Sequence, residues 1–373
     1  MTLPRRQRPK VLHFVTGGFS GATQVAVDLV RAHGASGRFD ALLVLRRKRT
    51  TLPERVRALQ ADGLRVELVP GWSHAATVWA LASLCRRFQP DILVAHGYSE
   101  HLWGRYAGLL AGVRHLVHVE HNSRERYNAW RLVQARWLAR RTDAIVGCSE
   151  GVRSALLGYG FPQDRVHAIP NGIRLEPYAN APAHTFVQRI PGIVMAARFA
   201  RQKDHATLLQ AVALLRTRGL RPPVLLAGGG KASARRAAER LAQTLGLADQ
   251  VTFLGHCNDV PGLLKGHQIC VLSTHYEGMP LSLIEGMAAG CAVVGSQVVG
   301  VQEVVDSGRT GLLVEHANPQ ALADALATLL NQPQDAARMA AAAHAEVLQR
   351  YGLNTMTERY EALLGSLLEK SLP

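Results

Sequence analysis

The segment His275–Val305 places two carboxylates among several glycines and a proline. Glu277 stands near its start, and Glu285 follows eight residues later within a predicted helix. Carboxylates separated by about two helical turns can reach two hydroxyl-bearing groups, such as a sugar and a ribose. Ordinary acids on a helix surface are the alternative, but the surrounding glycines and proline favour a binding role.

The residues between these glutamates suit an anion. Gly278 would let the backbone approach a ligand closely, and Met279 and Pro280 lead into the helix, whose first turn tolerates proline. The free N–H groups of Leu281 and Ser282 would then point out of the positive helix end. A diphosphate is a ligand that such an end favours.

Two cations follow an apolar strand predicted at residues 193–196. Arg198 and Lys203 lie there in one loop with Arg201, so a solvated basic cluster is the alternative to a phosphate site. Further along, His256 is a candidate contact to a nucleotide base. The three glycines at 228–230 either cradle part of a nucleotide or form a close turn before a helix.

In the N-terminal half, Gly17 and Gly18 follow the first predicted strand and precede a helix, where a loop can approach a phosphate. Their GGxxG pattern lacks the GxGxxG spacing of the dinucleotide fingerprint, so a plain strand-to-helix turn is the alternative.

His121 ends a later predicted strand, and we expect it to face a ligand, although His115 and His118 compete for that role. A structural role is the alternative for His121. His96, at another strand end, is expected to be structural or to face an acceptor.

The Glu277–Glu285 pattern resembles the E-x7-E signature of the retaining glycosyltransferase family 4, whose members adopt the GT-B fold. The resemblance extends over most of the chain and is strongest over residues 198–305. Arg198 and Lys203 resemble the family's R-x4-K pair. The turn at residues 169–172 resembles its interdomain IPNG motif, while Arg174 departs from the acid that relatives often have there.

The resemblance implies roles for these residues. Glu277 would orient or electrostatically support the transferring sugar, and Glu285 would hold the ribose. Arg198 and Lys203 would stabilise charge on the leaving diphosphate. His121 would lie against the donor sugar.

Gly17 and Gly18 resemble the family's N-terminal glycine loop, which approaches the transferred sugar and phosphate. Substitution on one face of the sugar through an oxocarbenium-like state is implied, with the leaving β-phosphate accepting the acceptor's proton. No metal and no cofactor is then expected, in keeping with the lack of a DxD motif at a strand end.

Apolar strands alternate with amphipathic helices along the chain, which predicts an α/β fold with parallel sheets. We expect two Rossmann-like domains facing across a cleft, as in GT-B. The acceptor-side domain is predicted at 1–174, a linker at 174–190 and the donor domain at 191–350. A last helix at 351–373 is predicted to pack back on the first domain.

The chain of 373 residues has a formal net charge of +15, most of it in the first half. Residues 1–183 contain 26 basic and 13 acidic side chains. The segment Arg124–Arg141 adds Tyr127, Trp130 and Trp137 on one predicted helical face, which is typical of helices on anionic membranes. A core-facing aromatic stripe is the alternative.

Other classes are less consistent with the sequence. Aromatic residues are too few, at 6%, and too confined for a nucleic-acid surface. The five cysteines lack metal-ligand or disulfide spacing, and no segment has the apolar length of a membrane span. With no signal peptide recognisable, we expect a cytoplasmic protein, and the basic first half adds the hypothesis of a peripheral position at the inner membrane face.

The sequence therefore predicts a retaining glycosyltransferase that uses UDP-sugar, or secondly GDP-sugar, on a glycan or lipid-linked acceptor of a surface polysaccharide. A UDP-sugar epimerase of the same fold and a nonenzymatic sugar-nucleotide-binding protein are the alternatives.

Overall fold

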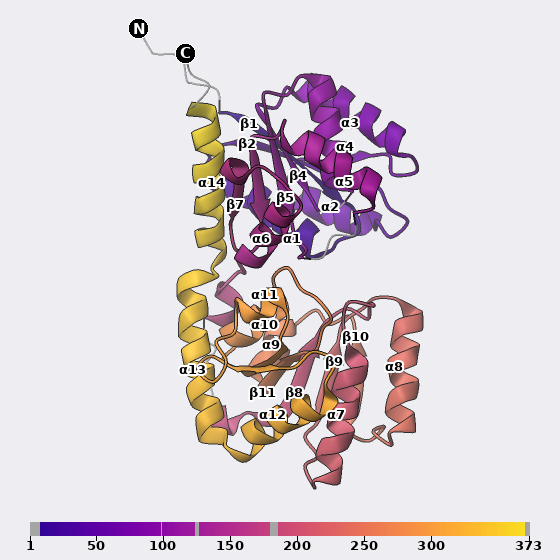
Figure 1. Ribbon diagram of the computed structural model, residues 1–373, viewed down its shortest axis with the longest axis vertical. Coiled ribbons are helices and arrows are strands. Elements are labelled where there is room, and N and C mark those ends of the chain that lie inside the picture. Colours follow the sequence, from indigo (N-terminus) through magenta and orange to yellow (C-terminus); the bar gives the residue numbers. More distant parts are fainter. Residues whose placement is uncertain (1–7, 98, 124–126, 180–185, 370–373) are drawn as a thin grey trace. The chain divides into compact units, whose positions relative to one another are not determined.

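The computed structural model describes residues 8–97, 99–123, 127–179 and 186–369 (Figure 1). The chain forms two compact units. Unit 1 comprises residues 1–171 together with 353–373, and unit 2 comprises 172–352. The segment predicted as a linker therefore belongs to unit 2, and the last helix belongs to unit 1.

Unit 1 is built on a seven-stranded sheet of order β3-β2-β1-β4-β5-β6-β7, in which all pairings are parallel. Its strands are β1 (Lys10–Thr16), β2 (Asp40–Arg46), β3 (Val66–Val69), β4 (Ile92–His96), β5 (His115–Glu120), β6 (Ala144–Gly147) and β7 (Val166–Ala168). Its α-helices are α1 (Gly21–Ser36), α2 (Pro53–Ala61), α3 (His74–Phe88), α4 (Glu100–Ala111), α5 (Ala129–Ala139), α6 (Glu150–Gly158) and α14 (Leu353–Glu369).

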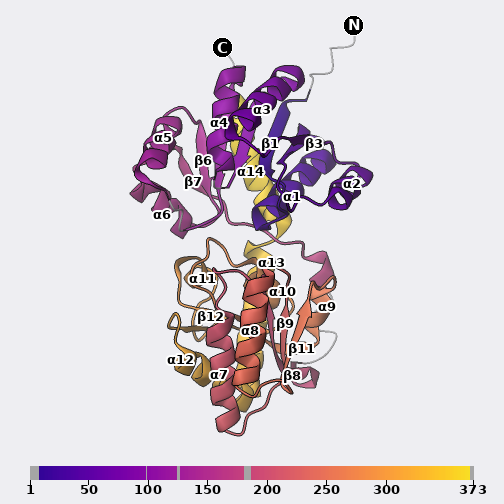
Figure 2. The same cartoon turned by 90° about the vertical axis from the view of Figure 1, so that its right-hand side faces the viewer.

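The two faces of this sheet are covered by different helices because alternate strand residues point to opposite sides. Val11 of β1 packs in a core with residues of α1 and α14, including Leu29 and Tyr360. Leu12 and Phe14 instead pack with residues of α3 and α4. Figure 2 shows α3 and α4 side by side on unit 1. Strands that are apolar on both faces are thereby buried, as the parallel fold requires.

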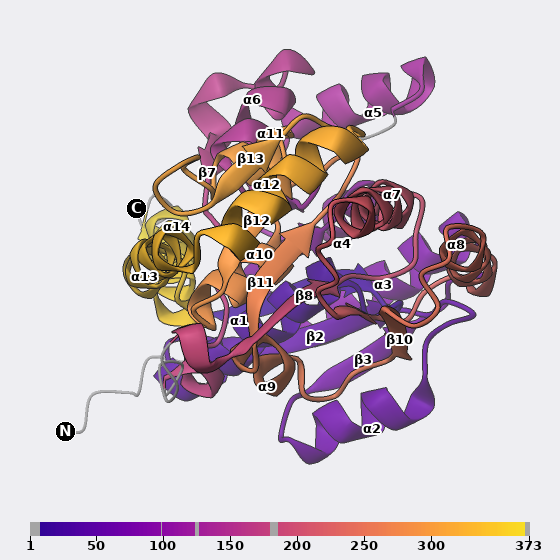
Figure 3. The same ribbon diagram turned by 90° about the horizontal axis from the view of Figure 1, so that it is seen from below.

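Unit 2 contains a six-stranded parallel sheet of order β10-β9-β8-β11-β12-β13. Its strands are β8 (Ile190–Ala196), β9 (Val224–Ala227), β10 (Val251–Gly255), β11 (His267–Leu272), β12 (Ala292–Ser296) and β13 (Leu312–Val314). Its α-helices are α7 (His205–Thr217), α8 (Ala232–Thr244), α9 (Val260–Lys265), α10 (Leu281–Ala288), α11 (Val299–Gln302), α12 (Pro319–Asn331) and α13 (Pro333–Arg350). Helix α7 packs against α8 and α12, and α10 packs against α9 and α13 (Figure 3).

The predicted α/β architecture with two parallel sheets is confirmed. One local prediction is wrong: Tyr127 does not share a helical face with the two tryptophans, since α5 begins only at Ala129. Arg124 and Arg126 of that predicted segment lie outside the described residues. Across the described part of the chain, no helix is both long and apolar enough to cross a bilayer.

Candidate functional site

Glu277 lies in the loop that follows β11, and Glu285 lies inside α10. Glu277 therefore precedes the helix that contains Glu285, and the two carboxylates are not separated by two turns of one helix. The helix starts only at Leu281, because Pro280 adopts a non-helical conformation with φ −85° and ψ 77°. The two glutamates therefore lie on different kinds of backbone, a loop and a helix.

The loop after β11 is joined to the loop after β8 through backbone hydrogen bonds. His275 N–H donates to Gln202 C=O over 2.9 Å, and Asp204 N–H donates to Ser273 C=O over 3.0 Å. The Gln202 side-chain amide also donates to Tyr276 C=O. These bonds hold the two loops in one register.

This register brings Lys203 to Glu277. The Lys203 ammonium donates to Glu277 Oε1 in an ion pair between two side chains that are largely removed from solvent. Lys203 also lines a surface pocket of about 490 Å³, together with Arg201, Lys231 and His275. The pocket is cationic, as a diphosphate site requires.

Gly300, at the start of α11, fixes the other side of the Glu277 loop. A Cβ at Gly300 would lie 2.5 Å from Gly278 C=O oxygen and 2.7 Å from that of Glu277. Real side chains do not approach backbone atoms so closely, so only glycine permits this packing. No role was predicted for Gly300 from the sequence, although its place within the signature segment was a usable signal.

The helix end is less open to an anion than predicted. Leu281 N–H donates to Met279 C=O over 3.1 Å, so it is not free. The N–H groups of Leu283 and Ile284 also have partners, because both donate to Pro280 C=O. Ser282 remains the candidate from this helix end.

Glu285 is half-buried, and burial raises the pKa of its carboxyl to about 7. Burial raises the pKa of the Tyr178 phenol, and the charge of Glu285 nearby raises it further. A carboxyl with a pKa near neutrality can either accept from or donate to a hydroxyl, and a ribose offers two of them.

Arg198 is exposed, and it makes no ion pair with any residue that the structure describes. Its neighbour Phe199 bonds to the glycine turn, with Phe199 N–H donating to Gly229 C=O over 2.7 Å. A Cβ at Gly228 would lie 2.1 Å from Ala197 C=O oxygen. Gly228 and Gly230 are thus needed for close approach to the Arg198 loop, which favours a structural turn. His256 is exposed at the end of β10.

In unit 1, Gly17 is held at the end of β1. Its N–H donates to Arg46 C=O over 2.8 Å, and its C=O accepts from Thr51 Oγ1 over 2.9 Å. A Cβ there would meet Thr51 Oγ1 at 2.6 Å, whereas Gly18 has more room. Gly17 is therefore a tightly packed turn residue, and Gly18 is the more accessible of the pair.

His121 is half-buried just beyond β5. Burial lowers the pKa of its imidazole to about 4, so the ring is neutral near pH 7. Its backbone N–H and that of Asn122 both donate to Glu120 Oε1, at 2.8 and 3.2 Å. Glu120 thus shapes the turn that presents His121.

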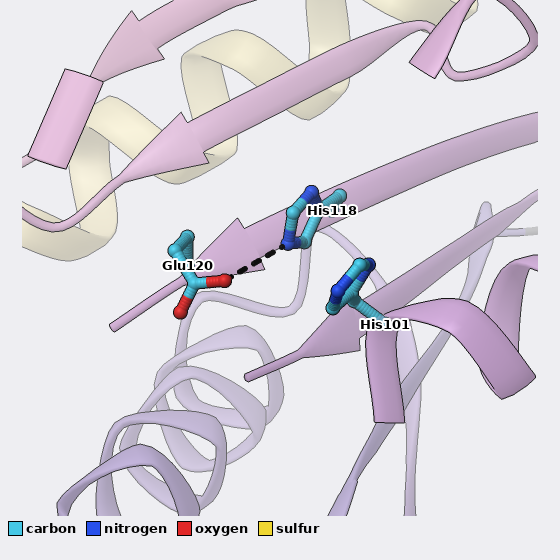
Figure 4. Close-up of side chains that lie close together, drawn as sticks. All are labelled: His101, His118 and Glu120. Carbon is cyan, nitrogen blue, oxygen red and sulfur yellow. Dashed lines mark ion pairs between the residues drawn. The ribbon is translucent and has the colours of Figure 1, made fainter. Parts of the chain in front are cut away.

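A buried group in unit 1 has the composition of a metal site: His101, His118 and Glu120, with potential ligand atoms within 4.8 Å of one another (Figure 4). Sequence spacing did not reveal it because the residues come from α4 and β5. Arg105, however, donates to His101 Nδ1 over 2.6 Å, and Tyr127 Oη lies 2.9 Å from His101 Nε2.

Both His101 nitrogens are therefore engaged, and a buried guanidinium lies beside the group. A divalent cation would have to displace these hydrogen bonds. It would also lie near the positive charge of Arg105, with only the Glu120 carboxylate to compensate for both. The arrangement fits a polar network in the core better than a metal centre.

The predicted site residues thus fall into two sets. Unit 2 contains Arg198, Lys203, His256, Glu285 and the residues 277–282, and the structure brings Lys203 into contact with Glu277. Unit 1 contains Gly17, Gly18 and His121.

Two family models match the chain. Residues 19–177 match the model described as Glycosyltransferase Family 4, and residues 181–346 match the one described as Glycosyl transferases group 1. Among similar curated proteins, EpsF of Bacillus subtilis is 30% identical over 321 residues, which is 80% of this chain and 81% of EpsF. The lipopolysaccharide core biosynthesis glycosyltransferase LpsE of Rhizobium meliloti is 26% identical and covers 61% of this chain and 65% of LpsE.

Solved structures give the same result for the fold. HepE of Anabaena, in complex with UDP and glucose, superposes with a TM-score of 0.83 at 21% identity, covering 96% of this chain and all of HepE. The lipopolysaccharide outer core galactosyltransferase WaaB superposes with a TM-score of 0.72 at 14% identity, covering 96% of this chain and 99% of WaaB.

Proposed function

Because this chain belongs to glycosyltransferase family 4 and has its GT-B fold, we propose that it transfers a hexose or an N-acetylhexosamine from a UDP-sugar with retention of configuration. The acceptor is a glycan or a lipid-linked precursor of a surface polysaccharide. The observation that carries the proposal is the ion pair between Lys203 and Glu277, which places a cation and a carboxylate at one point of the donor domain.

The charges suit the reaction. As the bond between the anomeric carbon and the β-phosphate oxygen breaks, negative charge builds on the diphosphate and positive charge on the sugar. Lys203 and the exposed Arg198 stabilise the negative charge on the diphosphate, and Glu277 supports the positive charge on the sugar. The acceptor hydroxyl attacks on the face that the diphosphate leaves, and its proton passes to a β-phosphate oxygen. This scheme requires no divalent metal.

Glu285 holds the ribose, and the turn formed by Met279 and Pro280 lets Gly278 and Ser282 approach the phosphates. Gly18 and His121 are proposed as sugar-contacting residues because they resemble the family's glycine loop and strand-end histidine. UDP is preferred to GDP because the solved structures of HepE contain UDP, with glucose or as UDP-glucose. A surface-polysaccharide acceptor is supported by the likeness to LpsE.

An anionic membrane surface is the proposed place of the acceptor. Trp79 on α3 and Trp130 and Trp137 on α5 are 74%, 70% and 44% exposed, which argues against the alternative of a core-facing stripe. Stacked rings connect these helices, since His74 of α3 stacks on Trp103 of α4, and Tyr106 of α4 stacks on both Trp103 and Trp137 of α5.

Charge on these helices is complementary to such a surface. Across α3, α4 and α5 the one acid is Glu100, and it is buried in ion pairs with Arg46 and Lys48. Exposed Trp137 also stacks under the Arg141 guanidinium, 3.9 Å from ring centroid to Cζ. Aromatic rings with arginines and without free carboxylates favour an anionic lipid interface. The protein is therefore proposed to work at the inner face of the cytoplasmic membrane.

Thermal unfolding with UDP, GDP, UDP-glucose, UDP-N-acetylglucosamine and GDP-mannose tests the donor assignment, because a ligand of the folded state raises the melting temperature in proportion to its affinity. We expect UDP and one UDP-sugar to raise it, and GDP not to. Hydrolysis of that UDP-sugar, with and without EDTA, then tests turnover and the absence of a metal requirement. A shift with GDP alone would overturn the UDP assignment.

A further inference from the structure

Three histidines on neighbouring strands of unit 1 form a continuous row of hydrogen bonds. His13 Nδ1 lies 3.0 Å from His96 Nε2, and His96 Nδ1 lies 3.3 Å from His121 Nε2. The rings of each pair are stacked at 27° and 16°. His121 therefore does not stand alone at the site but ends a chain that reaches into the core.

Strand register creates this row. Strand β4 lies between β1 and β5, and His13 pairs with Val94 while His96 pairs with Val119. His96 therefore lies two residues further toward the carboxyl ends of the strands than His13, and His121 lies two residues further than His96. All three are on the same face of the sheet. That face is the one covered by α1 and α14.

Each ring in the row is neutral near pH 7. Burial, followed by repulsion from neighbouring histidines, holds the pKa values of His13 and His96 well below the ordinary range. A neutral imidazole has one N–H and one bare nitrogen. Each of the two hydrogen bonds needs an N–H on one ring and a bare nitrogen on the next. The row therefore has only two arrangements: all N–H groups point toward His13, or all point toward His121.

A carboxylate lies beyond the His13 end. Glu361 of α14 lies 3.1 Å from His33 Nδ1, and the His33 ring centroid is 5.3 Å from that of His13. Although burial opposes ionisation, hydrogen bonds from Ser36 and His33 hold the pKa of Glu361 below its ordinary value. Glu361 is thus an anion, which also pairs with the half-exposed Arg38 guanidinium at 3.3 Å. The part of its charge that Arg38 leaves uncompensated favours N–H dipoles that point toward it.

We propose that His96 is a positioning residue that, with His13 and the charge of Glu361, keeps His121 as the tautomer protonated at Nε2 and bare at Nδ1. The inference deepens the proposed function, on which the role of His121 rests. His121 Nδ1 is buried and has no hydrogen-bond partner within the described residues. In this tautomer Nδ1 is bare and the N–H lies at Nε2, since the bond made by one ring nitrogen decides the state of the other. The row thereby fixes the direction of the dipole of the His121 ring.

The direct test is ¹⁵N NMR of the full chain labelled at histidine, at pH 7.5, because protonated and bare imidazole nitrogens give separate resonances. We expect His13, His96 and His121 to be protonated at Nε2 in the wild type. Protonation of His121 at Nδ1 would overturn the proposal whether or not the chain transfers a sugar, so its failure is distinguishable from failure of the proposed function.

Glu361→Gln tests the source of the bias. It removes the charge but keeps the size, and we expect the population of the opposite tautomer to become measurable in all three rings. Glu358→Gln, at an exposed position on the same helix, is the matched control and leaves the spectrum unchanged. An unchanged spectrum in Glu361→Gln that is still folded would exclude the carboxylate as the source.

Two substitutions of His96 separate positioning from packing. The amide of His96→Gln can donate to His13 and accept from His121, as the proposed tautomer of His96 does, whereas His96→Leu can do neither. We expect His96→Leu to lower kcat about tenfold with little change in UDP affinity, and His96→Gln to recover most of it. Equal loss in both variants, or a change in KM alone, would contradict the positioning role.

Discussion

The Lys203 ammonium contacts the carboxylate of Glu277 across 74 residues of sequence, from the loop after β8 to the loop after β11. The pair is nearly closed to solvent, so each charge depends on the other for compensation. In the proposed mechanism, a diphosphate that approached Lys203 would compete with Glu277 for the ammonium. Donor binding would then free the Glu277 carboxylate to support the sugar.

Glu277→Gln should lower kcat about 100-fold or more and change UDP affinity less than about threefold. The amide keeps the size and one hydrogen bond but cannot support positive charge on the sugar, which develops only in the transition state. Initial rates and calorimetric titration with UDP measure the two effects. Glu239→Gln on α8 is a suitable control, and unchanged turnover with lost UDP affinity would contradict this role.

Gly300→Ala should displace the Glu277 loop, because its Cβ would meet two backbone oxygens that cannot rotate away. We expect unit 2 to lose about 1–3 kcal/mol of stability and turnover to fall with it. Gly266→Ala, whose Cβ would make ordinary contacts at 3.5 Å, controls for the added methyl. Thermal unfolding and activity are the measurements; wild-type behaviour of Gly300→Ala would mean that this contact does not position the loop.

UDP affinity should rise between pH 6 and 8. Burial raises the pKa of Glu285 to about 7, and ribose hydroxyls donate best to the ionised carboxylate. Binding therefore favours the deprotonated form and releases a proton below the pKa. Calorimetric titrations in buffers of different ionisation enthalpy measure this release. Glu285→Gln should abolish it, and proton uptake in the wild type would oppose the assignment.

The free energy of unfolding of unit 1 should decrease more steeply than that of unit 2 as the pH is lowered. Burial lowers the pKa values of five fully buried histidines of unit 1, which are His13, His33, His96, His101 and His118. Below pH 6.5 the unfolded chain binds protons that the folded unit does not. The free energy of unfolding of unit 1 therefore decreases as the pH is lowered, by up to about 1.4 kcal/mol per pH unit for each histidine.

Hydrogen exchange measured from pH 7.5 to 5 would follow each unit separately. We expect the core amides of β1, β4 and β5 to lose protection before those of β8 and β11. His316→Gln, at an exposed position, should leave this order unchanged. Earlier loss of protection in unit 2 would contradict the prediction.

Replacing Trp130 and Trp137 together by serine should weaken binding to vesicles that contain anionic lipid by several-fold, because two exposed rings leave the interface. Added salt should weaken wild-type binding as well. Leu348→Ser, on α13, removes an exposed apolar side chain from unit 2 as a control. Co-sedimentation is the measurement, and equal recovery on neutral and anionic vesicles would remove the membrane from the proposal.

Much of the fold was predictable because its signals are local. Strands such as β4 and β12 are short apolar runs, and the helices between them show one apolar face, so their type follows from neighbouring residues. The segment around Glu277 was recognisable for the same reason, since its glycines, proline and acids are contiguous.

The contacts that join distant residues were decided by tertiary structure. Lys203 meets Glu277 because backbone bonds align two loops, and Gly300 is required by the carbonyl groups that pack on it. The histidine row exists because three strands pair in a particular register and α14 returns with Glu361 to α1. By itself the sequence determined which elements form and which side chains could act; only packing decided which of them touch, because distance along a chain carries no information about distance across a sheet.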